Sequence, residues 1–213
     1  MAKELNYRSA GTFEFLVATG AKSGENIYAF IEANARLQVE HTVTEETLDI
    51  DIVQAQLQIA AGKSLDNLGL SQNNIPKPHG YTIQLRVNME TMGQDGTAHP
   101  AGGTITTFDL PSGRGIRIDT YGYSGYRSSP RYDSLLAKSI CHSNSDNFAE
   151  AASLAYRALC EFRIEGVPTN IRFLQNLLLT PDFITQRLYT TYIDDHIAEL
   201  TEESSGHRRL FFD

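Results

Sequence analysis

The stretch from Ile31 to His41 reads IEANARLQVEH. Taken with the two-residue repeat of a β-strand, it separates into two faces of different character. The polar face carries Glu32, Asn34, Arg36, Gln38 and Glu40, and the apolar face carries Ile31, Ala33, Ala35, Leu37 and Val39. Side chains on one face of a strand lie about 6.6 Å apart. The sequence therefore predicts a row of polar groups on one rigid element, although the solvated outer face of an ordinary strand would show the same alternation.

The order of residue types along this row is typical of phosphoryl transfer to a small oxyanion. Glu32 and Asn34 offer the oxygen ligands that Mg²⁺ or Mn²⁺ prefers. Arg36 offers a planar fork for an oxyanion, and Gln38 adds a neutral donor. Glu40 is a carboxylate close to the arginine and could accept a proton. A metal site, an anion clamp and a base thus follow one another, which suits a reaction that depends on positioning and charge neutralisation.

A neighbouring strand, predicted from Thr12 to Val17, brings a further carboxylate. Glu14 stands between Phe13 and Phe15 in the sequence and so points away from both rings. The polar connection AKSGEN at 21–26 is typical of a hairpin loop. If the two strands pair, Glu14 can share a metal with the carboxylate at position 32; the alternative is an ordinary exposed glutamate.

The pattern then changes from strand to helix. Thr42 or Thr44 could cap this helix, and Glu45 lies where a capping box prefers an acidic residue. Apolar residues recur as far as Ala60, and Gly62 supplies a helix stop.

The remainder of the chain predicts an α+β fold. Residues 66–80 are rich in turn-forming residues and indicate a domain boundary. Beyond them the pattern favours strands at 81–87, 104–110 and 116–120, and helices at 146–162 and from 169 to just before Pro181. Ser145 or Asp146 could cap the first of these helices, and Thr169 the second.

Composition excludes several classes of protein. The chain has 213 residues, a formal net charge of −8 and no basic block, so nucleic acid is not expected as a partner. Neither a secretory signal nor an apolar run of about 20 residues is present, so we expect no membrane span. Cys141 and Cys160 form no metal-binding pair, and the six histidines are scattered, which argues against zinc. We expect a cytoplasmic protein, or a mitochondrial matrix protein in a eukaryote.

The string FIEANARLQVEHTVTEE at 30–46 resembles the signature of the biotin carboxylases, which reads F-I-E-x-N-x-R-(L/I)-Q-V-E-H-x-V-T-E. The resemblance continues to about Asp195. The last part of the matching sequence is most similar to carboxylases of the pyruvate carboxylase and acyl-CoA carboxylase types. The further matching strings are DIVQAQLQIAAG at 51–62, IQLRVN at 83–88, YDSLLAK at 132–138, EFRIEGVPTNIRFLQNLL at 161–178 and TTYIDD at 190–195. It implies the C-terminal part of an ATP-grasp domain (antiparallel strands plus helix) at 1–75, a β-rich biotin carboxylase C-terminal domain with packed helices at 76–200, and a polar tail at 201–213.

That family uses ATP to join bicarbonate to biotin through carboxyphosphate. The resemblance implies that its cofactors and substrates are ATP, Mg²⁺ or Mn²⁺, bicarbonate and biotin on a carrier domain. The implied metal ligands are Glu14, Glu32 and Asn34. The implied bicarbonate site is formed by Arg36, Gln38 and the backbone of Val39, with Glu40 as the base. The resemblance also implies that Arg86 corresponds to the arginine that stabilises the biotin enolate. Asp133 corresponds to an acidic residue that supports the site residues without binding the substrates itself.

Some positions depart from the family pattern. Thr91 replaces an acidic residue in RVNMET, the stretch YRSSPRYDS lacks the usual Pro-Pro, and Arg114 stands where a dimer surface often carries a bulky residue, although Arg117 matches a basic position there. No phosphate-cradling Gly-rich loop is found, so we expect the chain to need an N-terminal biotin carboxylase half, to be inactive alone, and to form a homodimer.

Two other functions fit the sequence less well. One is a non-catalytic dimerisation or interaction module, or a remnant of such an enzyme. The other is a different ATP-grasp ligase, such as a carbamoyl phosphate synthetase-like enzyme; the RLQVEH string and Arg86 argue against it.

Overall fold

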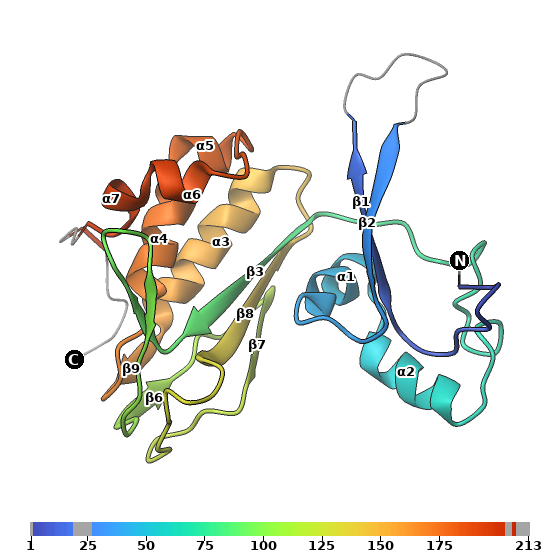
Figure 1. Ribbon diagram of the computed structural model, residues 1–213, viewed down its shortest axis with the longest axis horizontal. Helices are drawn as coiled ribbons and strands as arrows, with labels where there is room; N and C mark the ends of the chain where they lie inside the picture. Colours follow the sequence, from blue (N-terminus) through green and yellow to red (C-terminus); the bar gives the residue numbers. More distant parts are fainter. Residues whose placement is uncertain (1, 19–26, 203–205, 208–213) are drawn as a thin grey trace. The chain divides into compact units, whose positions relative to one another are not determined.

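The computed structural model describes residues 2–18, 27–202 and 206–207, and it divides the chain into two compact units, Met1–Pro78 and His79–Asp213 (Figure 1). Each unit combines antiparallel strands with helices, so the α+β fold class is confirmed. No helix in the described ranges is long and apolar enough to cross a membrane.

The first unit is built on a two-stranded antiparallel ribbon of β1 (Thr12–Val17) and β2 (Tyr28–Asn34). The bounds predicted for the first strand are confirmed. The prediction that one strand continues from Ile31 to His41 is wrong, because β2 ends at Asn34 and the chain bends immediately afterwards. The predicted hairpin loop at 21–26 lies outside the described residues.

Two helices, α1 (His41–Leu48) and α2 (Ile52–Ala60), follow where the pattern favoured one. Asp49 adopts a left-handed backbone with φ of 54°, which ends the first helix. Asp51 caps the second, because its carboxylate accepts a 2.6 Å hydrogen bond from the Gln54 amide. The predicted threonine caps and capping box are wrong: Thr42 is fully buried inside α1, which begins one residue earlier. Gly62, at φ of 93°, ends α2 as predicted.

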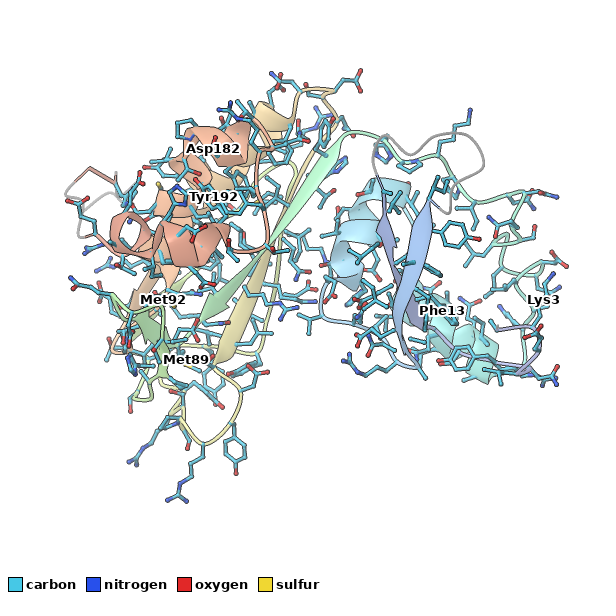
Figure 2. All side chains as sticks on the ribbon, turned by 45° about the horizontal axis from the view of Figure 1, so that its top comes forward. Lys3, Phe13, Met89, Met92, Asp182 and Tyr192 are labelled. Carbon is cyan, nitrogen blue, oxygen red and sulfur yellow. The ribbon has the colours of Figure 1, made fainter. Side chains whose placement is uncertain are left out.

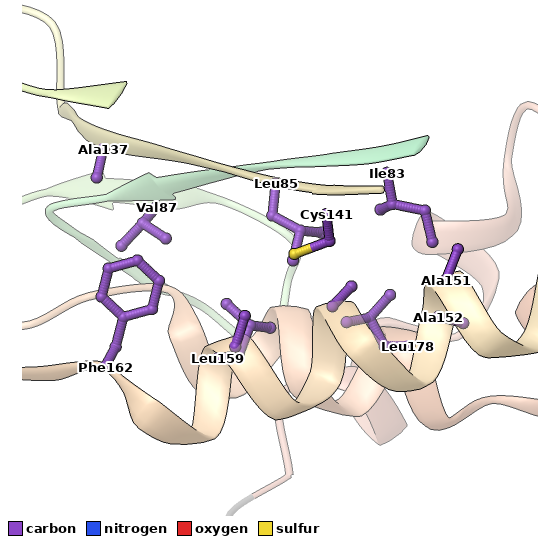
Figure 3. Close-up of a cluster of buried hydrophobic side chains, with 12 residues drawn as sticks. Ile83, Leu85, Val87, Ala137, Cys141, Ala151, Ala152, Leu159, Phe162 and Leu178 are labelled. Atoms are coloured by element: carbon purple, nitrogen blue, oxygen red, sulfur yellow. The ribbon is translucent and has the colours of Figure 1, made fainter. Parts of the chain in front are cut away.

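The second unit has a three-stranded antiparallel sheet in the order β3 (Tyr81–Asn88), β8 (Leu135–Ser143) and β7 (Ile116–Thr120). Helices α3 (Phe148–Glu161) and α4 (Ile171–Leu179) cover one face of the sheet (Figure 1). Figure 3 shows the buried side chains of the sheet pointing toward those of the helices. Ile83, Leu85 and Val87 confirm the alternation predicted for β3, and each such side chain contributes about 2 kcal/mol when buried.

Several smaller elements complete this unit. They are β4 (Glu90–Met92), β5 (Ala98–Pro100), β6 (Thr107–Asp109), β9 (Arg163–Glu165), α5 (Pro181–Ile184), α6 (Tyr192–Asp195) and α7 (Ile197–Leu200). The strand predicted at 104–110 is too long: only β6 pairs regularly, and Thr104 makes a single bridge to Arg127.

The helix caps of this unit also differ from expectation. Asn147, and not Ser145 or Asp146, caps α3 by accepting a 3.1 Å hydrogen bond from the Ala149 amide. Asn170, and not Thr169, precedes α4, and its side chain turns away from the helix toward β3. In the expected polar tail, His207 lies against the body of the unit, with hydrogen bonds of 3.1 Å to Tyr156 and 2.7 Å to Asn176.

Candidate active site

The pairing of β1 with β2 places Glu14 directly opposite Glu32. Asn34 holds both carboxylates, because its Nδ2 atom donates hydrogen bonds of 2.7 Å to Glu32 Oε1 and 3.3 Å to Glu14 Oε1. Gln38 Nε2 donates a further bond of 2.8 Å to Glu14 Oε1. Four of the predicted site residues are therefore gathered into one hydrogen-bonded cluster.

An irregularity in the ribbon separates this polar cluster from the aromatic residues. The register shifts between Glu14 and Phe15, so that Glu14 pairs with Glu32 whereas Phe15 pairs with Phe30. Successive residues of β1 point to opposite faces, so the shift moves Phe30 to the face opposite Glu32, although the two residues are only two positions apart in β2. The rings of Phe15 and Phe30 lie 5.6 Å apart, edge to face.

The loop from 35 to 40 carries the remaining predicted residues of the first unit. The row of five polar groups on one strand is wrong from Arg36 onward, because the strand has already ended. The bend nevertheless turns Gln38 back to the ribbon. Arg36 is exposed, and its Nη1 atom donates a 3.3 Å bond to the Leu37 carbonyl. Val39 is half-buried, and Glu40 is the exposed N-cap residue of α1.

A buried pair at the start of α1 anchors this loop. His41 Nδ1 lies 3.1 Å from Glu45 Oε1, and the two side chains are only 12% and 5% exposed. The same carboxylate oxygen accepts a 2.9 Å bond from the Ile52 amide at the start of α2. Glu45 thus joins the two helices. The sequence analysis missed this role because it treated Glu45 as part of a helix cap. The four-residue spacing between His41 and Glu45 is the signal that could have predicted the pair.

The donor set of the cluster fits a divalent cation. No group of three or more His, Cys, Asp or Glu side chains that could hold a metal is found within the described ranges. Mg²⁺ is, however, commonly bound by one or two carboxylates together with water and substrate phosphates. Glu14 and Glu32 provide two carboxylates, and rotation of the Asn34 amide would present its oxygen in place of its nitrogen.

Arg86 and Asp133 belong to the second unit. Arg86 is exposed on β3, on the face opposite the core, and pairs in register with Lys138 of β8. Lys138 lies 3.3 Å from Asp119 on β7, and Arg117 lies 2.9 Å from the same carboxyl. Partial burial acts to raise the pKa of Asp119, but the hydrogen bonds and charges of Arg117 and Lys138 outweigh it and hold that pKa below its usual value.

Asp133 has a local contact. It is exposed, and its Oδ1 atom accepts a 2.9 Å hydrogen bond from the Leu135 amide, which closes the turn before β8. The neighbouring Ser134 reaches further, with a 3.0 Å bond from its hydroxyl to Glu90.

Comparison with known families matches both units. Residues 84–195 match the biotin carboxylase C-terminal domain, and residues 1–68 match the ATP-binding domain of the carbamoyl-phosphate synthase L chain. The first match covers more than half of the chain. The chain belongs to the biotin carboxylase family, as its resemblance predicts.

Individual relatives agree with this assignment. The chain is 46% identical to a pyruvate carboxylase of Pichia angusta over 213 residues, covering 99% of this chain and 17% of the relative. A solved biotin carboxylase domain of a single-chain bacterial carboxylase is 45% identical with a TM-score of 0.81, covering 93% of this chain and 44% of that structure. A biotin carboxylase domain of a thermophilic 2-oxoglutarate carboxylase bound to bicarbonate is 38% identical with a TM-score of 0.81, covering 93% and 42%. The chain thus spans about a sixth of the curated relative and less than half of each solved domain.

Proposed function

We propose that this chain supplies the metal, bicarbonate and biotin contacts of an ATP-dependent biotin carboxylase. The observation that carries the proposal is the cluster in which Asn34 and Gln38 bind the paired carboxylates Glu14 and Glu32, in a chain of this family. Two carboxylates, two amides and an adjacent arginine on one ribbon and its loop suit a site where ATP phosphates meet a small oxyanion.

Glu14, Glu32 and Asn34 would hold Mg²⁺ or Mn²⁺. The bound cation would neutralise charge on the ATP phosphates as the γ-phosphoryl group is transferred. The two carboxylates are held in place before any ligand arrives, since each already accepts a bond from the Asn34 amide. Such pre-organisation limits the ordering cost of assembling the site.

Arg36, Gln38 and the backbone of Val39 hold bicarbonate. The exposed guanidinium of Arg36 can bind two oxygens of the anion at once. Glu40 takes the bicarbonate proton, a bicarbonate oxygen attacks the γ-phosphorus, and ADP leaves, giving carboxyphosphate. Because Gln38 also bonds to Glu14, the bicarbonate loop is tied to the metal carboxylates.

Arg86 serves the second half-reaction. Biotin, brought by a carrier domain, accepts the carboxyl group of carboxyphosphate on its ureido nitrogen. The bond from the carboxyl carbon to the phosphate oxygen breaks, and inorganic phosphate leaves with the proton of that nitrogen. The negative charge that develops on the ureido oxygen needs a cationic donor, and the arginine fork suits it. The exposure of Arg86 on the outer face of β3 supports this role.

The apolar face of the β1–β2 ribbon supports a further protein partner. Phe13, Phe15, Tyr28 and Phe30 are all exposed in the described chain, and Tyr28 is 64% exposed. An exposed cluster of large apolar side chains is a common mark of an interaction surface. The partner we infer is the N-terminal half of a biotin carboxylase, which would complete the ATP-grasp domain. A homodimer is part of the same proposal.

A second candidate is a carbamoyl phosphate synthetase-like ligase, which the family match of residues 1–68 favours when taken alone. The biotin carboxylase match at 84–195 argues against it, as does Arg86. A third candidate is a non-catalytic interaction module of the same family.

The test is ADP release by the purified chain with MgATP, bicarbonate and free biotin, repeated after addition of a separately expressed N-terminal half from a related carboxylase. We expect no turnover alone and bicarbonate-dependent turnover on mixing. Carbamoyl phosphate formation when ammonia replaces biotin would favour the second candidate. Stable binding of the two halves without any ADP release would favour the third.

A further inference from the structure

A buried carboxylate lies behind the end of β3. Glu90, the first residue of β4, is only 7% exposed. Its Oε1 atom accepts bonds of 3.0 Å from Asn88 Nδ2 and 3.3 Å from Asn170 Nδ2, and its Oε2 atom accepts a 3.0 Å bond from the Ser134 hydroxyl. Three segments far apart in the sequence therefore meet at one side chain.

The neighbours of Glu90 are tied to one another as well. Asn170 Oδ1 accepts a 2.9 Å bond from the Asn88 amide, and the Asn170 amide donates a 3.1 Å bond to the Asn88 carbonyl. The Ser134 carbonyl accepts a 2.8 Å bond from the amide of Met89, which Figure 2 labels. The end of β3, the start of α4 and the turn before β8 are thus joined.

This network holds the strand at a point where the sheet ladder is irregular. The register between β3 and β8 shifts between Val87 and Asn88, so that Val87 pairs with Ala137 but Asn88 pairs with Leu135. The regular cross-strand bonds are disrupted at such a shift. The hydrogen bonds of Asn170 and Glu90 therefore take over the fixing of this strand end.

Burying a carboxylate is less favourable for the stability of a fold than burying an apolar side chain. Burial of a charged or polar group lowers stability unless its hydrogen bonds compensate, and an apolar side chain of similar volume is often at least as stabilising. The donors that meet Glu90 are two amides and one hydroxyl. The arrangement is better suited to fixing a geometry than to gaining stability.

The hydrogen bonds around Glu90 fix the backbone next to Arg86. Asn170 Nδ2 donates a 3.1 Å bond to the Arg86 carbonyl and also contacts Glu90. Asn88 lies two residues after Arg86, so both side chains leave the same face of the strand. A movement of the strand end would therefore shift the backbone from which the Arg86 side chain extends.

We propose that Glu90 is a positioning residue that sets the direction of Arg86 toward biotin. The proposal rests on the role of Arg86 stated under the proposed function. Glu90 acts through Asn88, Asn170 and Ser134, and Asp133 contributes by closing the turn that presents the Ser134 hydroxyl. A reacting group displaced by about 1 Å can lose on the order of 100-fold in rate, which is the size of effect available to such a residue.

The test compares variants of Glu90 in the complete carboxylase, with two assays. Biotin carboxylation needs Arg86, whereas bicarbonate-dependent ATP cleavage, measured without biotin, does not. For Glu90→Ala we expect kcat for biotin carboxylation to fall by about 10- to 100-fold, with ATP cleavage within about twofold of the parent.

Glu90→Gln is the matched conservative variant. Its amide oxygen can accept from Asn88 and Asn170, and its NH₂ group can donate to Ser134, because a hydroxyl can reverse from donor to acceptor. We expect kcat for biotin carboxylation to stay within about threefold of the parent. In Glu90→Gln with Ser134→Ala, the NH₂ group loses that acceptor, and we expect the activity to fall toward that of Glu90→Ala.

Three results would overturn the proposal: unchanged biotin carboxylation in Glu90→Ala, an equal loss in both assays, or a glutamine variant as impaired as the alanine variant. If Glu90→Ala does not fold, Ser134→Ala decides. We expect a loss of biotin carboxylation alone of about tenfold, since Ser134 supplies one of the three hydrogen bonds that hold Glu90. An unchanged kcat, or a parallel loss in ATP cleavage, contradicts the proposal. Unaltered biotin carboxylation in Arg86→Ala would instead refute the proposed role of Arg86 itself.

Discussion

Gln38 donates a 2.8 Å hydrogen bond to Glu14, although the two residues are 24 positions apart in the sequence. One residue belongs to the loop assigned to bicarbonate and the other to the carboxylates assigned to the metal. The bond joins these two halves of the candidate site, so a change at either residue should alter both bicarbonate binding and metal binding.

Gln38→Ala should therefore weaken bicarbonate and metal binding together. Loss of a hydrogen bond to a carboxylate costs roughly 1.5–3 kcal/mol, which corresponds to about a 10- to 100-fold rise in the bicarbonate KM or the Mg²⁺ requirement. Both are measured by titration in the complete enzyme. Gln56→Ala is the control, because the side chain of this half-buried glutamine bonds only to Ser9 among the contacts found in the described chain. A rise in the bicarbonate KM without a rise in the Mg²⁺ requirement, or the reverse, would show that this hydrogen bond does not couple the two sites.

Glu32→Gln should raise the Mg²⁺ concentration needed for ATP cleavage by about tenfold or more, since the variant removes one of the two anionic ligands that we propose. The Asn34 amide can still donate to the new side chain, so thermal unfolding without metal should change little. The control is Asp66→Asn, an exposed acid outside the cluster. An unchanged Mg²⁺ titration would remove Glu32 from the metal site.

Arg36→Ala should abolish carboxylation while leaving the fold intact. The side chain is exposed, and exposed substitutions usually change stability by less than about 0.5 kcal/mol. Arg36→Lys keeps the charge but loses the planar fork, so we expect intermediate activity. Turnover and urea unfolding are measured together; normal turnover in the alanine variant would refute the bicarbonate assignment.

Asp119→Asn should change how stability depends on pH. The pKa of Asp119 is lowered in the folded chain, because Arg117 and Lys138 outweigh the opposing effect of partial burial. Its ionised form thus stabilises the fold above the unfolded pKa, and this contribution is lost as pH falls through the lower folded pKa. The asparagine variant should be less stable at pH 7, with the difference narrowing below about pH 4 in urea titrations. A pH-independent difference would contradict this account.

Sequence alone could predict the parts of the site that depend on local pattern. The bounds of β1 follow from alternation on a short strand. The sequence predicted that Glu14 and Glu32 could meet only if the two strands pair, and their register depends on a shift between Glu14 and Phe15 that alternation does not predict. The end of β2 does not follow from the alternation of its residues. Its polar alternation continues past Asn34, but Asn34 pairs with Thr12, the first residue of β1, so no partner strand remains beyond it.

Contacts between distant segments were beyond the reach of local patterns. The split between α1 and α2 depends on the left-handed backbone of Asp49 and on the buried Glu45, which reaches the Ile52 amide. Likewise, nothing near Glu90 in the sequence indicates that Asn170 and Ser134 meet it. Both contacts are set by tertiary packing, which overrides capping preferences.

The most direct test of the central claim is bicarbonate-dependent ADP release by Glu40→Gln in the complete enzyme. The glutamine keeps the size of the side chain but cannot take the bicarbonate proton. We predict that ADP release falls to the level seen without bicarbonate, while MgATP binding and thermal stability are unchanged. ADP release that still rises with bicarbonate as in the parent enzyme would show that Glu40 is not the base, and would contradict the mechanism assigned to this loop.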